Sequence, residues 1–286
     1  RGAWSWELLP GTRPALRELL GAWGALELLP GAEILKANLA RTVIALPASA
    51  RRPSLIVKRY HVRGLRERLK YLALPSRAHR EWQALRALWR EGIPVPRPLA
   101  VGEERAGGIL RRAGLIMERI VDVAPAPRAL ESARGDRERR AELLGAMGAL
   151  VARLHAFGAD HGDLHAGNFL VRQDGPLDGP LATEVHVIDL HAVYLGGVIP
   201  RGRRIQNLAR LLHSLTGMID RREERALLDG YQASCGAGEE LLLADALSGP
   251  LRADLEGRAR RLERIRLRSR TRRCWKRSTL FTKERR

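Results

Sequence analysis

Hydrophobic residues in the first third of the chain gather in short runs separated by turn-forming stretches. The runs AEILKA, RTVIALP and SLIVKRY are rich in β-branched and aliphatic residues, which is typical of strands. We therefore predict three successive antiparallel strands between residues 32 and 60. A further pair of strands is expected at PLAVGEE and GLIMERI, within residues 98–120.

Longer patterns with helix boundaries alternate with these strands. Residues 13–29, bounded by Pro-Gly pairs, predict a first helix. Residues 76–91 begin with Ser76, the predicted N-cap, and end before Gly92, which delimits a helix of about four turns. A long helix is expected over 136–158, and the chain from about residue 203 is expected to be helical. The proline-rich stretch VDVAPAPRA between the second strand pair and the long helix is interpreted as a linker.

The hydrophobic pattern also predicts a hairpin in the second half, and this hairpin carries polar residues at one end. Strand FLVR follows the loop HGDLHAGN, and strand VHVIDL returns after a turn rich in Gly, Pro and Asp. Antiparallel pairing brings the start of the first strand beside the end of the second. Asp163 and Asn168 should therefore lie close to Asp189. Two carboxylates and an amide oxygen are hard donors that suit Mg²⁺.

A lysine and a glutamate upstream supply the complementary charges. Lys58 lies inside the apolar strand SLIVKRY, in a chain with only five lysines against 46 arginines, which suggests a requirement for a compact ammonium group. Glu81 shares one face of the helix at 76–91 with Leu85 and Leu88. An acid on a buried face needs a buried partner, and Lys58 is the predicted one.

These elements in this order resemble the catalytic set of protein-kinase-like proteins. The pattern H-x-D-x-x-x-x-N at 161–168 and the pair HGDLHAGN with IDLHAV resemble, more narrowly, the lipopolysaccharide core kinase family, whose members phosphorylate Kdo or heptose. The resemblance implies an α+β, two-lobed protein-kinase-like fold, with a small antiparallel sheet and one key helix in the N-lobe and a mainly helical C-lobe. We expect a helical extension over 1–30, the N-lobe over 31–120 and the C-lobe over 121–286.

The resemblance also implies roles for individual residues. Lys58 would hold the α- and β-phosphates of ATP and pair with Glu81, and Asp163 would accept the proton of the acceptor hydroxyl. Asn168 and Asp189 would hold magnesium, and His161 would brace the catalytic loop. The hinge that faces adenine is expected within IMERI at 116–120, which contains Met117 and Glu118.

Several features depart from the kinase pattern. No G-x-G-x-x-G joins the first two strands, so we expect Lys36 or Arg41 to help cover the phosphates. Gly162 replaces the arginine of H-R-D, which argues against a phosphorylation switch. No A-P-E motif follows Asp189, and the short interval before the next helix leaves little room for a docked peptide. A small-molecule or glycolipid acceptor is therefore favoured over protein.

Charge is concentrated in two zones of the chain. The net charge is +19, and most of it falls in residues 51–90 and in the basic tail, residues 251–286. Concentrated charge of one sign favours an anionic partner. We expect a cytoplasmic protein that docks on the anionic inner-membrane surface through the basic tail. Two cysteines cannot form a disulfide framework, and no apolar run is long enough for a membrane span.

Other interpretations of the same residues remain. His161, His165 and His191 are possible zinc ligands of a phosphoesterase, although the companion motifs of that chemistry are missing. Lys58 and Glu81 would also be compatible with a purely structural ion pair. A kinase or ATPase acting on an RNA-associated or small-molecule substrate, or a non-catalytic basic module that binds RNA or membrane, forms a second class of hypothesis. The completeness of the catalytic set favours the enzyme, and the sparse aromatic residues of the basic tail argue against single-stranded nucleic acid.

Overall fold

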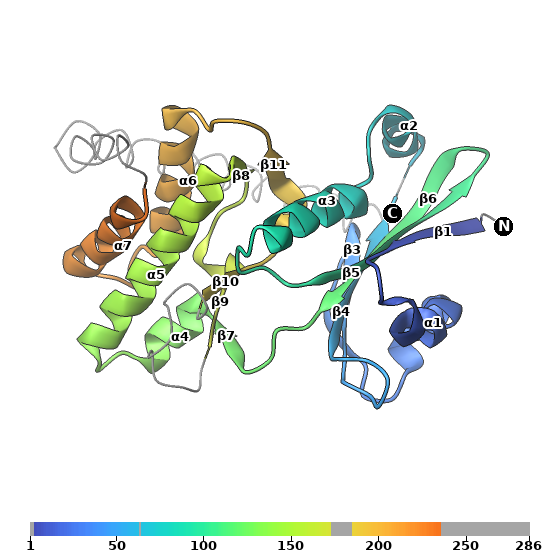
Figure 1. The fold of residues 1–286 in the computed structure, drawn as a ribbon, viewed down its shortest axis with the longest axis horizontal. Helices are drawn as coiled ribbons and strands as arrows, with labels where there is room; N and C mark the ends of the chain where they lie inside the picture. The colour runs from blue at the N-terminus through green and yellow to red at the C-terminus, as the bar shows by residue number, and fades with distance from the viewer. Residues whose placement is uncertain (1–2, 63, 173–184, 236–286) are drawn as a thin grey trace, which may run out of the picture.

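A six-stranded sheet and a group of helices form the two ends of the molecule (Figure 1). The computed structural model describes residues 3–62, 64–172 and 185–235. The basic tail, for which membrane docking is expected, lies outside the described residues, as does the turn within the predicted hairpin. None of the helices in the described ranges is long and apolar enough to cross a membrane.

The sheet is antiparallel throughout, with the strand order β1-β5-β6-β4-β3-β2. The three successive strands and the later strand pair predicted from the sequence are confirmed. The strands are β1 (Ala3–Leu8), β2 (Glu33–Ala37), β3 (Arg41–Leu46), β4 (Leu55–His61), β5 (Pro98–Ala106) and β6 (Ile109–Glu118).

The first 30 residues differ from the expected helical extension. Ala3–Leu8 form β1, which pairs with β5 along one edge of the sheet. The single helix expected over 13–29 is instead α1 (Arg13–Gly21) followed by a 3-10 helix, η1 (Trp23–Leu28). These helices bury Leu16, Leu26 and Trp23 against one face of the sheet. Strand pairing through backbone groups, which the hydrophobic pattern does not report, makes this segment part of the sheet.

Helix α3 (Arg77–Arg90) packs on the opposite face of the sheet. The Ser76 hydroxyl accepts a hydrogen bond from the His79 amide, and Gly92 beyond the end has a φ of 69°, so the predicted cap and stop are both confirmed. Trp82 and Leu85 of this helix are fully buried, and Glu81 lies on the same buried face. A shorter helix before it, α2 (Leu65–Ala73), was not predicted.

The second lobe is mainly helical, with two small sheets. The stretch interpreted as a linker forms β7 (Val123–Pro125) and α4 (Ala126–Ser132) instead, because β7 pairs with β9. The long helix is confirmed as α5, capped by Asp136. The elements are α5 (Arg137–Ala156), β8 (Ala159–His161), β9 (Phe169–Arg172), β10 (Val185–Val187), β11 (Val193–Leu195), α6 (Arg201–Ser214) and α7 (Arg221–Ala233).

Helices α5 and α7 cross at backbone contact. A Cβ at Gly148 would collide with the carbonyl of Leu227, and a Cβ at Gly230 would collide with the carbonyl of Gly145. Glycine at both positions lets the two helices approach closely. This crossing anchors the helix that leads directly into the loop at 161–168.

Candidate active site

Two side chains of α6 form hydrogen bonds with the backbone of the loop at 161–168. Arg210 donates a hydrogen bond of 2.5 Å to the carbonyl of Gly162, and the Ser214 hydroxyl accepts one of 2.8 Å from the Ala166 amide. The side-chain amide of Asn168 donates to the carbonyl of Asp163 at 2.9 Å. The loop therefore has a fixed shape, and its two predicted functional residues are bonded to each other.

Gly162 is required by the way the loop meets the next segment. A Cβ at this position would lie 2.8 Å from the carbonyl oxygen of Ala192, whose carbonyl also accepts the Gly162 amide at 3.1 Å. Any side chain would push the two segments apart. The absence of the H-R-D arginine thus has a packing reason as well as the regulatory implication drawn from the sequence.

The predicted hairpin brings Asn168 and Asp189 together. Strands β9 and β10 pair antiparallel, with Phe169 opposite Val187. One residue beyond that pair, the amide of Ile188 donates to the carbonyl of Asn168 at 2.8 Å. Asp189 has a φ of 63°, a left-handed conformation that is uncommon for a non-glycine residue and that clusters at functional sites.

Three cationic or polar side chains surround the carboxylate of Asp189. Arg41 donates to both of its oxygens at 2.7 Å, Lys58 approaches to 3.3 Å, and Nδ1 of His191 lies 2.8 Å away. Burial alone would raise the pKa of Asp189, but the hydrogen bonds from His191 and Arg41 and the charge of Lys58 lower it far below its usual range. Asp189 is therefore ionised at any physiological pH.

The predicted pair of Lys58 and Glu81 is confirmed. The ammonium of Lys58 lies 2.5 Å from Oε1 of Glu81, and the two side chains are 8% and 1% exposed. The other carboxylate oxygen of Glu81 accepts a short hydrogen bond from the hydroxyl of Tyr60. Burial and the adjacent carboxylate of Glu81 raise the pKa of Tyr60 well above its ordinary value, which keeps this hydroxyl protonated. Strand β4 thus holds one carboxylate of α3 with two side chains.

His161 is buried beneath the loop. Its Nδ1 lies 3.3 Å from the amide of Asp163, in position to accept a hydrogen bond from it. Burial lowers the pKa of His161, although the backbone of Ile188 opposes the shift. A neutral imidazole that supports the loop backbone is consistent with the predicted bracing role, which remains a prediction.

A cleft of about 1010 Å³ lies between the two lobes, and most of the predicted site residues line it. Glu81 and His161 lie behind the lining, where they hold Lys58 and the loop. The predicted residues on the cleft surface are Lys36, Arg41, Lys58, Met117, Glu118, Asp163, Asn168 and Asp189.

The cleft is lined by both apolar and charged side chains. Its apolar lining comes from both lobes, with Val43 and Ile56 on one side and Leu170 and Ile188 on the other. The sequence gives no signal for these four residues, because nothing in an apolar residue on a strand distinguishes a ligand-facing side chain from a core one. The basic lining residues are Lys36, Arg41, Lys58, Arg77, Arg119 and Arg128.

The predicted hinge segment contributes to the lining of the cleft. Met117 and Glu118 end β6, and both line the cleft. The amide of Glu118 donates to the carbonyl of Arg97 at 2.9 Å, and the amide of Arg119 donates to the carbonyl of Ser54 at 2.8 Å. These two N–H groups are therefore already bonded within the protein, and contact of Met117 and Glu118 with a nucleotide remains a prediction.

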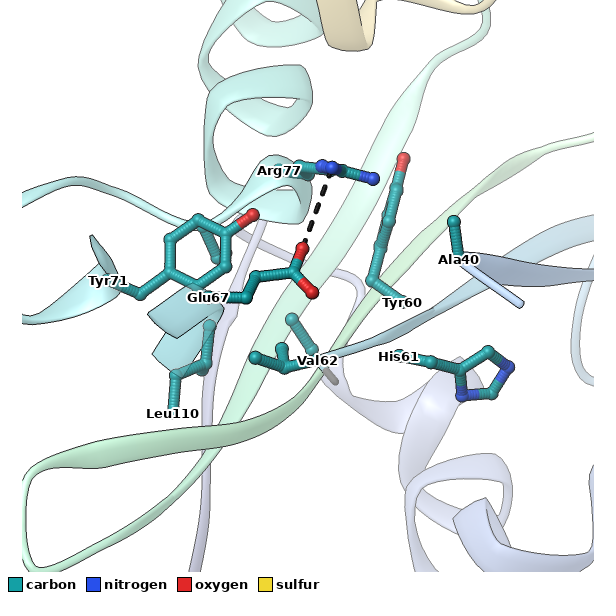
Figure 2. A pocket seen from close by; sticks show the side chains of 10 residues that line it. Ala40, Tyr60, His61, Val62, Glu67, Tyr71, Arg77 and Leu110 are labelled. Atoms are coloured by element: carbon teal, nitrogen blue, oxygen red, sulfur yellow. Dashed lines mark ion pairs between the residues drawn. The ribbon is translucent and has the colours of Figure 1, made fainter. Parts of the chain in front are cut away.

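A second cavity beside α2 is too small to be a site. It is lined by Tyr60, Tyr71 and the ion pair of Glu67 with Arg77 (3.5 Å), as Figure 2 shows, and its volume is about 10 Å³. A space of this size holds one water molecule at most. Ala40, Tyr60 and Arg77 line both this cavity and the cleft.

The residues present fit a magnesium ion. Asp189 is ionised, and Asn168 uses its amide nitrogen in the bond to Asp163, which leaves its oxygen as the donor atom available to a metal. Mg²⁺ takes one or two protein ligands and fills its other positions with water and phosphate. Across the described residues, no three His, Cys, Asp or Glu side chains gather as a metal site, so the histidines weighed as zinc ligands do not form one cluster there.

A sheet lobe with a lysine–glutamate pair and a helical lobe with Asp163, Asn168 and Asp189 facing it define the protein-kinase-like class of folds. A solved structure described as WaaP in complex with acyl carrier protein superposes with a TM-score of 0.64 at 22% identity, covering 90% of this chain and 99% of that one. The chain belongs to the lipopolysaccharide kinase (Kdo/WaaP) family, whose sequence profile matches residues 49–231. The predicted fold class and family are confirmed.

Curated relatives carry a more specific description. A protein described as 3-deoxy-D-manno-octulosonic acid kinase from Stenotrophomonas maltophilia (strain R551-3) is 38% identical over 155 residues, which are 54% of this chain and 55% of that protein. A protein of the same description from Xylella fastidiosa (strain M23) is 32% identical over 163 residues, 57% of this chain and 59% of that protein. The matches thus span little more than half the length of these relatives.

Proposed function

We propose that the protein is an ATP- and Mg²⁺-dependent phosphotransferase that phosphorylates a sugar hydroxyl, of Kdo or heptose, in the lipopolysaccharide core. The observation that carries the proposal is the cleft in which the buried pair of Lys58 and Glu81 faces Asp163, Asn168 and Asp189. A solely structural ion pair would have no need of ionised and amide side chains gathered opposite it. The kinase descriptions of the relatives support the same assignment.

The apolar and the charged lining residues of the cleft match the base and the phosphates of a nucleotide, respectively. Val43 and Ile56 of the sheet lobe and Leu170 and Ile188 of the helical lobe give the cleft an apolar lining suited to a flat base, and Met117 at the end of β6 adds to it. Lys58 is one of the charged lining residues, and the bonds of Lys58 and Tyr60 to Glu81 hold strand β4 against helix α3. Lys58 binds the phosphates there as a compact cation.

Transfer requires alignment and charge neutralisation more than covalent chemistry. Asp163 accepts the proton of the acceptor hydroxyl as that oxygen attacks the γ-phosphorus, and the bond to the leaving ADP oxygen breaks. Asn168 and Asp189 would hold magnesium, which would supply counter-charge to the phosphates. Neutral His161 keeps the backbone of Asp163 in place.

The cleft also favours an anionic acceptor. Arg119, directly after β6, and Arg128 of α4 line it, and both are exposed. Guanidinium groups recognise carboxylate and phosphate by paired hydrogen bonds. Kdo carries a carboxylate, so an acidic sugar of the lipopolysaccharide core fits this lining. Between Kdo and heptose, the descriptions of the relatives favour Kdo.

The proposal places the protein on the cytoplasmic face of the inner membrane as a peripheral protein. It is supported by the +19 charge and by the basic tail, residues 251–286, which lies outside the described residues. Each basic residue near an anionic surface contributes about 1 kcal/mol of attraction. Co-sedimentation with anionic vesicles should fall with salt and on deletion of residues 258–286, whereas absence of vesicle binding at low salt would end this part of the proposal.

Labelled ATP offered with a panel of acceptors tests the function. The panel comprises deacylated core oligosaccharide, intact lipopolysaccharide, an aminoglycoside, RNA and casein, each incubated with wild type and with Asp163→Asn. We expect label on the core oligosaccharide or lipopolysaccharide, and a loss of that label with the variant. Exclusive labelling of RNA or casein would contradict the proposed acceptor, and binding of RNA without any transfer would favour the binding module.

A further inference from the structure

Cationic side chains compete with a metal ion for Asp189 in the arrangement that the structure shows. Its Oδ1 is met by Arg41 at 2.7 Å, by His191 at 2.8 Å and by Lys58 at 3.3 Å, and its Oδ2 is met by Arg41 at 2.7 Å. A magnesium ion binds oxygen at about 2.0–2.1 Å. Oδ2 meets only Arg41, so a lone pair remains there, but a dication on that oxygen would lie against the positive charge of the guanidinium.

Arg41 lies on an element built to hold it over the cleft. It is the first residue of β3, directly after the turn that replaces the glycine-rich loop. Oδ1 of Asn38 accepts hydrogen bonds of 2.9 Å from the amides of both Ala40 and Arg41, and the Asn38 amide donates to the Arg41 carbonyl at 3.0 Å. The backbone of Arg41 is thus fixed, whereas its long side chain can change partner by rotation alone.

The chemistry of the guanidinium suits the other occupant of the cleft. Its planar fork pairs with phosphate oxygens as well as it does with a carboxylate. A guanidinium stays protonated in proteins, so Arg41 is a cation with either partner. The residue lies outside the segment 49–231 that the family profile matches.

We propose that Arg41 guards the metal site and exchanges partners when the nucleotide binds. This inference rests on the proposed function. Without nucleotide, Arg41 occupies Asp189 and keeps a lone divalent ion out. With a magnesium–nucleotide complex, Asp189 passes to the metal and Arg41 passes to the phosphate oxygens, so one ion pair replaces another. The exchange makes metal and nucleotide bind cooperatively. It also means that Arg41, directly after the turn before β3, covers the phosphates in place of a glycine-rich loop.

The test is divalent-ion affinity measured without nucleotide, by Mn²⁺ electron paramagnetic resonance. Arg41→Gln frees both oxygens of Asp189, so it should bind Mn²⁺ alone about tenfold more tightly than wild type, since a charge-assisted bidentate pair is lost from the free state. In the presence of a non-hydrolysable ATP analogue, its Mn²⁺ affinity should change only a few-fold. The factor by which nucleotide strengthens metal binding should therefore fall by about tenfold.

Two further variants keep the test decisive. Arg77→Gln removes another cation from the cleft lining, one paired with Glu67 instead of Asp189, and reports the general effect of a lost charge; its Mn²⁺ affinity should rise by less than about twofold. Arg41→Lys keeps the charge without the fork and should fall between wild type and Arg41→Gln. Circular dichroism confirms that each variant is folded.

The outcomes separate this inference from the proposed function. If wild type binds the metal–nucleotide complex and Arg41→Gln binds Mn²⁺ alone no more tightly than Arg77→Gln, the guard is overturned while the kinase assignment stands. If wild type binds no metal–nucleotide complex, the proposed function fails first. Tighter Mn²⁺ binding by Arg41→Gln, together with the lost cooperativity, supports the exchange.

Discussion

Replacement of Lys58 by methionine should destabilise the protein even without ligand. Glu81 is 1% exposed, and its carboxylate is shared between Lys58 at 2.5 Å and the hydroxyl of Tyr60. Methionine fills a similar volume, so the main effect is a buried carboxylate that has lost its counter-charge. Removal of one partner of a buried pair costs about 3–5 kcal/mol. Because Tyr60 remains as a donor, we expect a loss near the lower limit, about 3 kcal/mol.

Urea-induced unfolding without nucleotide measures this loss, with far-UV circular dichroism as the signal. The double variant Lys58→Met/Glu81→Gln removes the stranded charge as well, so it should regain about 2 kcal/mol of what Lys58→Met loses. Lys70→Met, at an exposed position on α2, is the control and should change the free energy of unfolding by less than about 1 kcal/mol. A loss below about 1 kcal/mol for Lys58→Met, or effects of the two substitutions that simply add, would refute the reasoning.

Three further predictions concern the supports of the site. Tyr60→Phe removes the second donor to Glu81 and should lower the free energy of unfolding by about 1.5–3 kcal/mol, measured by urea titration; no change would show that the hydroxyl contributes nothing. Because burial depresses the pKa of His161 below its unfolded value of about 6.5, stability should fall as pH drops through that value, by at most about 1.4 kcal/mol per unit, and His161→Gln should show a shallower fall between about pH 7.5 and about pH 5.5. Gly148→Ala should destabilise the α5–α7 crossing by more than about 2 kcal/mol, while Gly145→Ala, three residues away with only an ordinary contact, should be neutral or stabilising in thermal unfolding.

The sequence predicted contacts of the candidate site correctly where a residue type was unusual for its position. Lysine at position 58 stands out in an arginine-rich chain, and Glu81 stands out on an apolar helix face, so their pairing could be predicted before the structure confirmed it. The hairpin between β9 and β10 followed from two apolar runs and a turn, and it fixed the proximity of Asn168 and Asp189. Local patterns and residue chemistry were sufficient for these features.

Other features depended on contacts between distant segments, which the pattern along the chain does not report. β1 exists because its backbone pairs with β5, about 95 residues later. Val43, Ile56, Leu170 and Ile188 resemble core residues in sequence and differ only in lining the cleft. Arg41 was one of many arginines and was singled out only through its position in the turn; its bidentate bond to Asp189 became visible once the two lobes were placed together.

The account depends most on the separate tasks of Asp163 and Asp189, and paired measurement of nucleotide affinity and turnover tests them. Asp163→Asn should leave the affinity for the magnesium–nucleotide complex within a few-fold, measured by calorimetry, while turnover with the accepted sugar falls by roughly 10² or more. Asp189→Asn should weaken nucleotide binding and abolish transfer, because the phosphates lose their magnesium counter-charge. Near-normal turnover by Asp163→Asn, or wild-type protein that shows no magnesium-dependent nucleotide binding, would contradict the account.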